Sequence, residues 1–135
     1  MGSITMNSTQ SFVIAVPVSA NKRLIKAKGR RDFINSKGYQ RWFDMAVIQL
    51  KQQRTNPTIT GRVKVAITMH YSDHRRRDLD NSLKGFFDAC SHAGVWEDDC
   101  QIDDIHVVRA EVMKPGCLVA EITEIATLVE DKIHD

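Results

Sequence analysis

The run from Gly61 to His70 is the feature that most restricts how this chain can fold. Apolar residues occupy every second position, and polar or small residues fill the positions between them: Val63, Val65, Ile67 and Met69 alternate with Arg62, Lys64, Ala66 and Thr68. This period of two is typical of a β-strand with one face against a core and the other exposed. The chain is therefore expected to contain a sheet whose apolar face is covered by other elements.

Two segments repeat their apolar residues at the spacing of a helix. The first begins at Ser36 or Lys37 and ends near Arg54, because Asn56-Pro57 cannot continue it. The second covers 81–93 and ends at Gly94. Their apolar stripes, which we expect to face the core, are Tyr39, Trp42, Phe43, Ala46, Val47 and Leu50 in the first and Leu79, Leu83, Phe86, Phe87, Cys90 and Ala93 around the second.

Three shorter apolar segments complete the expected sheet. They span 11–16, then 102–112 with a slip near Ile105 that indicates a bulge, and finally 118–122. The turn Lys114-Pro115-Gly116 separates the last two, which predicts that they pair as an antiparallel hairpin. The order β-α-β-α-β-β describes an α/β (α+β mixed) fold, a single small domain with one sheet of about four strands and both helices on one face.

The length of 135 residues suits one domain. We expect residues 1–10 to be a disordered extension, residues 11–124 to form the domain and residues 125–135 to be a tail. No apolar run approaches the ~20 residues of a membrane helix, and the three cysteines lack the Cys-x-x-Cys spacing of a zinc knuckle. These patterns favour a cytoplasmic protein with no membrane partner.

The net charge of +2 hides an uneven distribution. Basic residues dominate between 22 and 41, and acidic residues dominate between 97 and 104, which suggests a polyanionic partner and a bound cation. The segment 17–36 is predicted to be a long basic loop that either lies along phosphates or is a solvated surface. Its candidate DNA-binding residues are Lys22, Arg23, Lys26, Lys28 and Arg30.

The segment Arg75-Arg76-Arg77-Asp78-Leu79-Asp80-Asn81 places three cations directly before two carboxylates. If the backbone is extended here, Asp78 and Asp80 point to the same side. Such a pair suits Mg²⁺, which is usually held by one or two carboxylates together with waters and substrate phosphates, and the arginines would bind those phosphates. The alternative is a solvated turn in which Asp80 caps the following helix.

A second charged segment, Glu97-Asp98-Asp99, follows the second helix behind Trp96, which we expect to be buried and to fix this loop. If that helix folds back along the sheet, one of these acids joins Asp78 and Asp80 around one or two metal ions, an arrangement suited to a nuclease. Lys84 lies one turn after Asp80 and is either a salt-bridge partner or a group that neutralises charge on a phosphate.

These residues resemble a known family. The succession of Arg77-Asp78-Leu79-Asp80-Asn81, Lys84, Phe87-Asp88-Ala89 and Ala93-Gly94-Val95-Trp96-Glu97-Asp98-Asp99 is similar to RusA, the phage-derived family of Holliday-junction resolvases. The segment Pro17-Val18-Ser19-Ala20-Asn21 resembles the family's Pro-x-x-x-Asn element, with Val18 where a second proline is often found. The resemblance extends from the first strand to about Glu124.

The resemblance implies a homodimeric crossover junction endodeoxyribonuclease that uses Mg²⁺, or Mn²⁺ in its place, to nick four-way DNA symmetrically in DNA recombination and repair. It implies that Asp78, Asp80 and Asp99 are the metal-binding catalytic acids and that Lys84 is the catalytic lysine. Asp88 is expected to be a structural hydrogen-bond acceptor.

The remaining candidates for DNA binding are Arg75, Arg76, Arg77, Asn81 and Asn21. Two other functions are compatible with the same residues. One is a structure-selective DNA-binding protein without catalysis, and the other is a metal-dependent nuclease that acts on other branched DNA.

Overall fold

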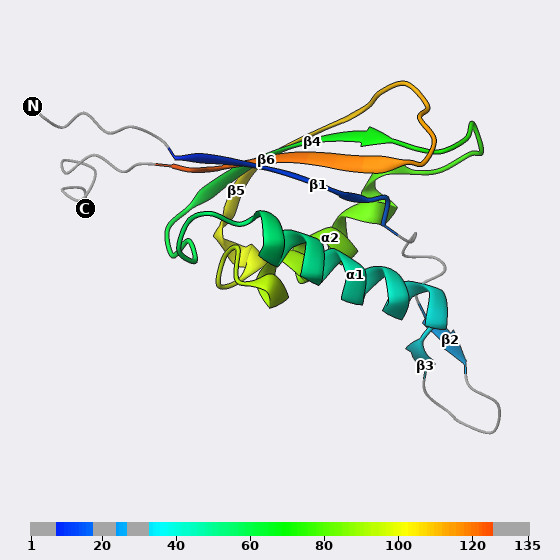
Figure 1. Cartoon of the computed structure of the whole chain (residues 1–135), viewed down its shortest axis with the longest axis horizontal. Coiled ribbons are helices and arrows are strands. Elements are labelled where there is room, and N and C mark those ends of the chain that lie inside the picture. The colour runs from blue at the N-terminus through cyan, green and yellow to red at the C-terminus, as the bar shows by residue number, and fades with distance from the viewer. Residues whose placement is uncertain (1–7, 18–23, 27–32, 126–135) are drawn as a thin grey trace, which may run out of the picture.

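The computed structural model describes residues 8–17, 24–26 and 33–125, and it has the expected order of elements with one addition (Figure 1). In chain order its main elements are β1 (Thr9–Ala15), β2 (Leu24–Lys26), β3 (Phe33–Asn35), α1 (Lys37–Gln53), β4 (Val63–His70), α2 (Leu83–Ala93), β5 (Ile102–Arg109) and β6 (Cys117–Glu124). Two 3₁₀ turns, η2 (Leu79–Ser82) and η3 (Asp99–Gln101), precede α2 and β5.

Four strands form one open sheet in the order β1-β6-β4-β5. β6 is antiparallel to both of its neighbours, whereas β4 and β5 are parallel because α2 connects them. Both α1 and α2 lie on one side of this sheet, as Figure 1 shows. The predicted fold class and the placement of the helices on one face are confirmed.

The predicted hairpin between the last two strands is wrong. β6 lies between β1 and β4, where its inward residues Leu118, Ala120 and Ile122 are fully buried. β5 forms the edge, and most of its side chains are exposed, including the charged Asp103 and Asp104. A strand with an apolar face buries more of its surface in the centre of a sheet than at the edge. Charged side chains on an edge strand prevent it from pairing with the edge of another molecule.

The boundaries of two strands also differ from the prediction. β1 begins at Thr9, so the first two of its residues had been assigned to the disordered extension, and β5 ends at Arg109 instead of Val112. The bulge expected near Ile105 is present, but the register between β4 and β5 shifts earlier, where Val63 pairs with Ile102 and Lys64 with Asp104. Residue Asp103 is therefore the additional residue of the edge strand.

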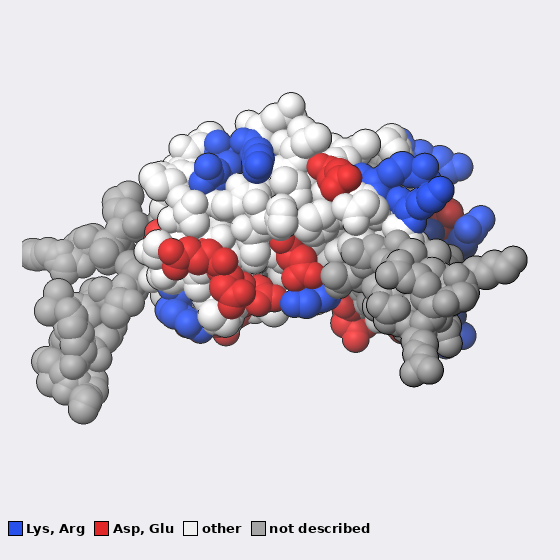
Figure 2. All heavy atoms as spheres, turned by 90° about the horizontal axis from the view of Figure 1, so that it is seen from below, with Lys and Arg blue, Asp and Glu red and all other residues white. Residues whose placement is uncertain are grey.

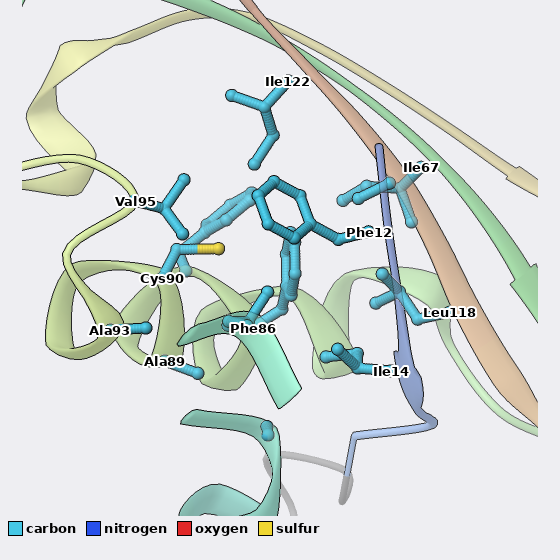
Figure 3. Close-up of a cluster of buried hydrophobic side chains, with 14 of the residues drawn as sticks. Phe12, Ile14, Ile67, Phe86, Ala89, Cys90, Ala93, Val95, Leu118 and Ile122 are labelled. Carbon is cyan, nitrogen blue, oxygen red and sulfur yellow. The ribbon is translucent and has the colours of Figure 1, made fainter. Parts of the chain in front are cut away.

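The core lies between the sheet and the two helices (Figure 3). The alternation that predicted β4 is confirmed, because Val63, Val65, Ile67 and Met69 are all at most 1% exposed. Phe12, Ile14, Leu118 and Ile122 extend this apolar face across β1 and β6, and Phe86, Ala89, Cys90 and Ala93 of α2 pack against it. This packing fixes the position of α2 on the sheet, which decides where its polar face points.

The segment 17–36 was predicted to be a loop, but it contains a short antiparallel pair, β2 with β3. The pair lies beside the beginning of α1, away from the main sheet (Figure 1). Three-residue strands give almost no alternation pattern, which explains why the sequence did not reveal them.

Among the residues that the structure describes, no helix is long and apolar enough to cross a membrane.

Candidate active site

Lys84 contacts two acidic residues, one on its own helix and one from the segment that follows it. It is the second residue of α2, and its Nζ lies 3.1 Å from Asp88 Oδ1 and 3.2 Å from Asp99 Oδ2. Asp88 is one turn along the same helix, whereas Asp99 comes from the segment after it. The ammonium donates hydrogen bonds to these two carboxylates, which raise the pKa of Lys84 above its usual value of 10.5, with Asp88 making the larger contribution. Lys84 is therefore positively charged at neutral pH.

Asp99 is brought to Lys84 by a sharp return of the chain. Gly94 ends α2 with a φ of 79°, in the left-handed region that favours glycine, and Arg54 Nη1 donates to its carbonyl oxygen at 2.8 Å. Trp96 is fully buried, and its indole nitrogen donates to Ser91 Oγ at 2.9 Å. The expectation that Trp96 anchors this loop is confirmed.

Gln101 and Asp98 fix the turn that begins with Asp99. Asp98 is the N-cap of η3 and accepts from the Cys100 backbone N–H at 3.1 Å, and the hydrogen bonds from Cys100 lower the pKa of this carboxyl. The buried Gln101 amide accepts from the backbone N–H groups of Glu97 and Asp98, each at 2.8 Å. Asp98 therefore holds the conformation of the turn, whereas Asp99 remains on the side of Lys84.

Asp78 and Asp80 follow a different backbone path from the one expected. Asp78 is extended, with φ −94° and ψ 132°, but Asp80 lies within η2. An extended backbone through 78–80 was the condition for both side chains to point to the same side, and it is not met, because β4 already ends at His70 and a 3₁₀ turn starts at Leu79. The expectation that Asp80 lies just before the helix is confirmed, since η2 leads directly into α2.

All three predicted acids are accessible, but the structure does not gather them into one cluster. Asp78 and Asp80 are exposed, and the Asp99 side chain is 29% exposed. Within residues 8–17, 24–26 and 33–125, no group of three or more His, Cys, Asp or Glu side chains is arranged closely enough to hold a metal ion. What the structure does bring together is Asp99, Lys84 and Asp88.

A pocket of about 330 Å³ opens beside this ion pair. Lys84, Asp88, Asp98 and Asp99 line one part of it, and the remaining lining residues come from α1 and the second half of α2: Tyr39, Gln40, Phe43, Ser91 and His92. On this helical side of the molecule, acidic side chains form a band from the left of the view to its centre (Figure 2). The largest group of lysines and arginines lies at the right end, and smaller basic patches lie at the left end and below the band.

The three consecutive arginines have different environments. Arg77 pairs with Asp73 at 2.7 Å and lies over the Tyr71 ring at 4.8 Å, so it is largely committed to holding its own loop. Arg75 is 80% exposed and only loosely paired with the same aspartate, at 3.6 Å. Arg76 is also exposed. Arg75 and Arg76 are therefore the members of this cluster whose side chains are most accessible to solvent.

Arg109 is a site residue that the sequence reasoning missed. It donates from Nη2 to the carbonyl oxygen of Arg77, and its guanidinium lies 5.4 Å from the centre of the Tyr71 ring. Tyr71 is 4% exposed and continues the alternation of β4, which was the available signal for its burial. Together these contacts fix the backbone immediately before Asp78.

Several predicted DNA-binding residues cannot be placed. Asn21, Lys22, Arg23, Lys28 and Arg30 lie outside the described residues, and Lys26 belongs to β2, of which only the backbone is described. Asn81 is half-buried in η2, and its backbone N–H donates to the Asp78 carbonyl at 3.3 Å.

Comparison with known proteins assigns the class. A family model described as "Endodeoxyribonuclease RusA" matches residues 15–121. The crossover junction endodeoxyribonuclease rusA of Enterobacteria phage HK97 is 37% identical over 123 residues, which cover 91% of this chain and 100% of the relative. Its counterparts in Shigella sonnei and Escherichia coli K12 are 38% and 37% identical over 117 residues, covering 87% of this chain and 96% of each relative. The chain belongs to the RusA family of endodeoxyribonucleases, as the motifs predicted.

Proposed function

We propose that this RusA family member is an Mg²⁺-dependent endonuclease that resolves Holliday junctions by paired, symmetric nicks. The observation that carries the proposal is the meeting of Lys84 with Asp99, 15 positions further along the chain, at 3.2 Å beside an open pocket. Packing of the core does not require the exposed Lys84 and the half-buried Asp99 to meet, since neither side chain belongs to the core. The relatives with known names are crossover junction endodeoxyribonucleases, which supports the same reaction.

Asp78, Asp80 and Asp99 fit a divalent cation by the chemistry of their side chains. All three offer hard carboxylate oxygens that solvent reaches, and neither Asp78 nor Asp80 forms an ion pair with another described residue. Mg²⁺ bound by these residues would lower the pKa of an attacking water and offset negative charge on the phosphate. Mn²⁺ prefers similar oxygen ligands and would substitute for it.

The basic residues would position the DNA. Lys84 would donate a hydrogen bond to the phosphate at the cleaved bond, where negative charge builds up. Arg75 and Arg76 would bind neighbouring phosphates, together with the basic segment 22–30, in contacts that do not depend on base sequence. The protein would act in the cytoplasm of a bacterial cell, where such junctions arise during recombination.

Two nicks in one junction require two equivalent sites, so we propose a homodimer. The sheet face opposite the helices supports this proposal. Its register aligns Val13, Val119, Thr68 and Val108 in one row across all four strands. Val13 and Val108 are 49% and 42% exposed, and no described element covers them. A second copy of the chain would bury this row.

The test is a comparison of substrates at equal concentration: a synthetic four-way junction, a flapped duplex, a linear duplex and a single strand of the same sequence, each end-labelled. The proposal predicts Mg²⁺-dependent nicks in the junction at symmetric positions and little cleavage of the linear forms. Equal cleavage of the flap would indicate a nuclease for other branched DNA. Tight junction binding without nicks in Mg²⁺ or Mn²⁺ would indicate a binding protein.

A further inference from the structure

The two acceptors of Lys84 differ in how they are held. Asp88 lies on the same helix as Lys84, so the distance between their backbones is fixed by α2. Asp99 belongs to η3 and reaches Lys84 only because the chain returns after Gly94. The two carboxylates are about equally exposed, at 28% for Asp88 and 29% for Asp99, and both line the pocket beside the ammonium.

The order of the pair in the helix is not the order that stabilises a helix. Lys84 lies in the first turn of α2, next to the positive end of the helix dipole, and Asp88 lies one turn closer to the negative end. A carboxylate before a lysine, four residues apart, is the more favourable arrangement, and this chain has the reverse. Stabilisation of the helix therefore does not explain why Lys84 and Asp88 occupy these two positions.

We propose that Asp88 is the positioning residue of Lys84. The inference rests on the proposed function in one respect, that Asp99 serves as a metal ligand. A carboxylate that binds a cation has less negative charge to share, so the hydrogen bond from Lys84 to Asp99 weakens when the site is loaded. Asp88 then keeps the Lys84 ammonium facing the pocket, where it can donate a hydrogen bond to a phosphate. The function of Asp88 is thus to hold Lys84 in place when Asp99 releases it.

Kinetics separate positioning from folding. Asp88→Asn should lower the single-turnover rate of junction cleavage at saturating Mg²⁺ about tenfold, since small displacements of a catalytic group have effects of at least this size. Junction binding should stay within twofold of wild type, and Asp88→Glu should recover most of the rate. The matched control is Asp103→Asn on β5, which removes the exposed ion pair between Asp103 and Arg62. This variant should leave the rate unchanged.

A second measurement follows the Lys84 ammonium itself and does not depend on cleavage. In protein labelled with ¹⁵N-lysine, an ammonium group held by hydrogen bonds gives a ¹H–¹⁵N correlation signal. A lysine ammonium without hydrogen bonds to the protein loses this signal, because its protons exchange rapidly with water. The Lys84 signal, assigned with Lys84→Arg, should persist in Asp99→Asn and disappear in Asp88→Asn/Asp99→Asn. It should also persist in wild type with Mg²⁺ and disappear in Asp88→Asn with Mg²⁺.

The two measurements distinguish failure of this inference from failure of the proposed function. Loss of the Lys84 signal in Asp99→Asn alone would overturn the inference, as would an Asp88→Asn variant that cleaves junctions at the wild-type rate. A wild-type protein that binds no Mg²⁺ and cleaves no junction would contradict the proposed function, while the metal-free comparison of Asp99→Asn with the double variant would still decide the function of Asp88.

Discussion

The side chain of Gln101 should be one of the most important polar groups for the stability of this protein. It is 6% exposed and joins the acidic turn to the segment before β4. Its oxygen accepts from the Glu97 and Asp98 backbones at 2.8 Å, and its nitrogen donates to the carbonyl oxygens of Ile59 and Gly61 at 2.9 and 2.8 Å. Gln101→Ala would leave all four backbone groups without this partner.

The expected loss of stability follows from these four hydrogen bonds. Each contributes about 1 kcal/mol net, and a buried backbone group left without a partner costs about 1–3 kcal/mol. Glu97 and Asp98 are exposed, so water can replace their acceptor, whereas Ile59 is buried. We therefore expect Gln101→Ala to lower the free energy of unfolding by about 2–4 kcal/mol. Cleavage should also fall, because the turn that carries Asp99 is released.

Urea unfolding followed by tryptophan fluorescence measures this effect, because Trp96 is buried in the adjacent loop. The control is Gln53→Ala, which removes two hydrogen bonds to the Val13 backbone in an exposed position. That variant should lose no more than about 1 kcal/mol, since water can replace the contacts. A loss below about 1 kcal/mol for Gln101→Ala, equal to the control, would refute the reasoning.

Three further predictions concern other parts of the molecule. Gly94→Ala places a side chain at a φ of 79° and should cost about 1–2 kcal/mol by thermal unfolding; an unchanged midpoint would contradict the assigned end of α2. Val108→Glu introduces a charge into the apolar row and should shift sedimentation towards the monomer, whereas an unaffected dimer would place the interface elsewhere. The hydrogen bond from Arg77 lowers the pKa of Asp73 from 3.8, so the pair stabilises the protein above about pH 4 and the effect disappears as the pH falls through the lowered pKa. The stability difference between wild type and Asp73→Asn should therefore shrink in acid, and a difference that is independent of pH would argue against the pair.

The elements with regular periodicity could be predicted from the sequence. The alternation in β4 and the helical stripes of α1 and α2 each reflect a local repeat that faces one core. Strand pairing is not local, which is why β6 was assigned to β5 although it lies between β1 and β4. Adjacency in sequence favours a hairpin, but the burial of Leu118, Ala120 and Ile122 requires a central position.

The candidate site was predicted in part. The burial of Trp96, which holds the loop after α2, was predicted and is confirmed. The contact between Lys84 and Asp99 was not itself predicted, because the sequence expected Asp99 to join Asp78 and Asp80. The sequence left open whether the backbone is extended from Asp78 to Asp80, since a 3₁₀ turn leaves no repeat in the sequence. Asp88 follows Lys84 by four residues, a spacing that predicts a pair on one face of a helix. The hydrogen bond from Gln101 to the Ile59 carbonyl could not be predicted, because it joins segments that only the tertiary structure brings together.

The most direct test of the central claim is cleavage of an end-labelled four-way junction by wild type and by Asp80→Asn, in Mg²⁺ and in EDTA, with Asp103→Asn as the control for a lost surface carboxylate. The account predicts paired symmetric nicks by wild type and by the control only when Mg²⁺ is present, and junction binding without nicks by Asp80→Asn. Full cleavage by Asp80→Asn in Mg²⁺, or cleavage by wild type in EDTA, would contradict the assignment of this acid to a metal-dependent site.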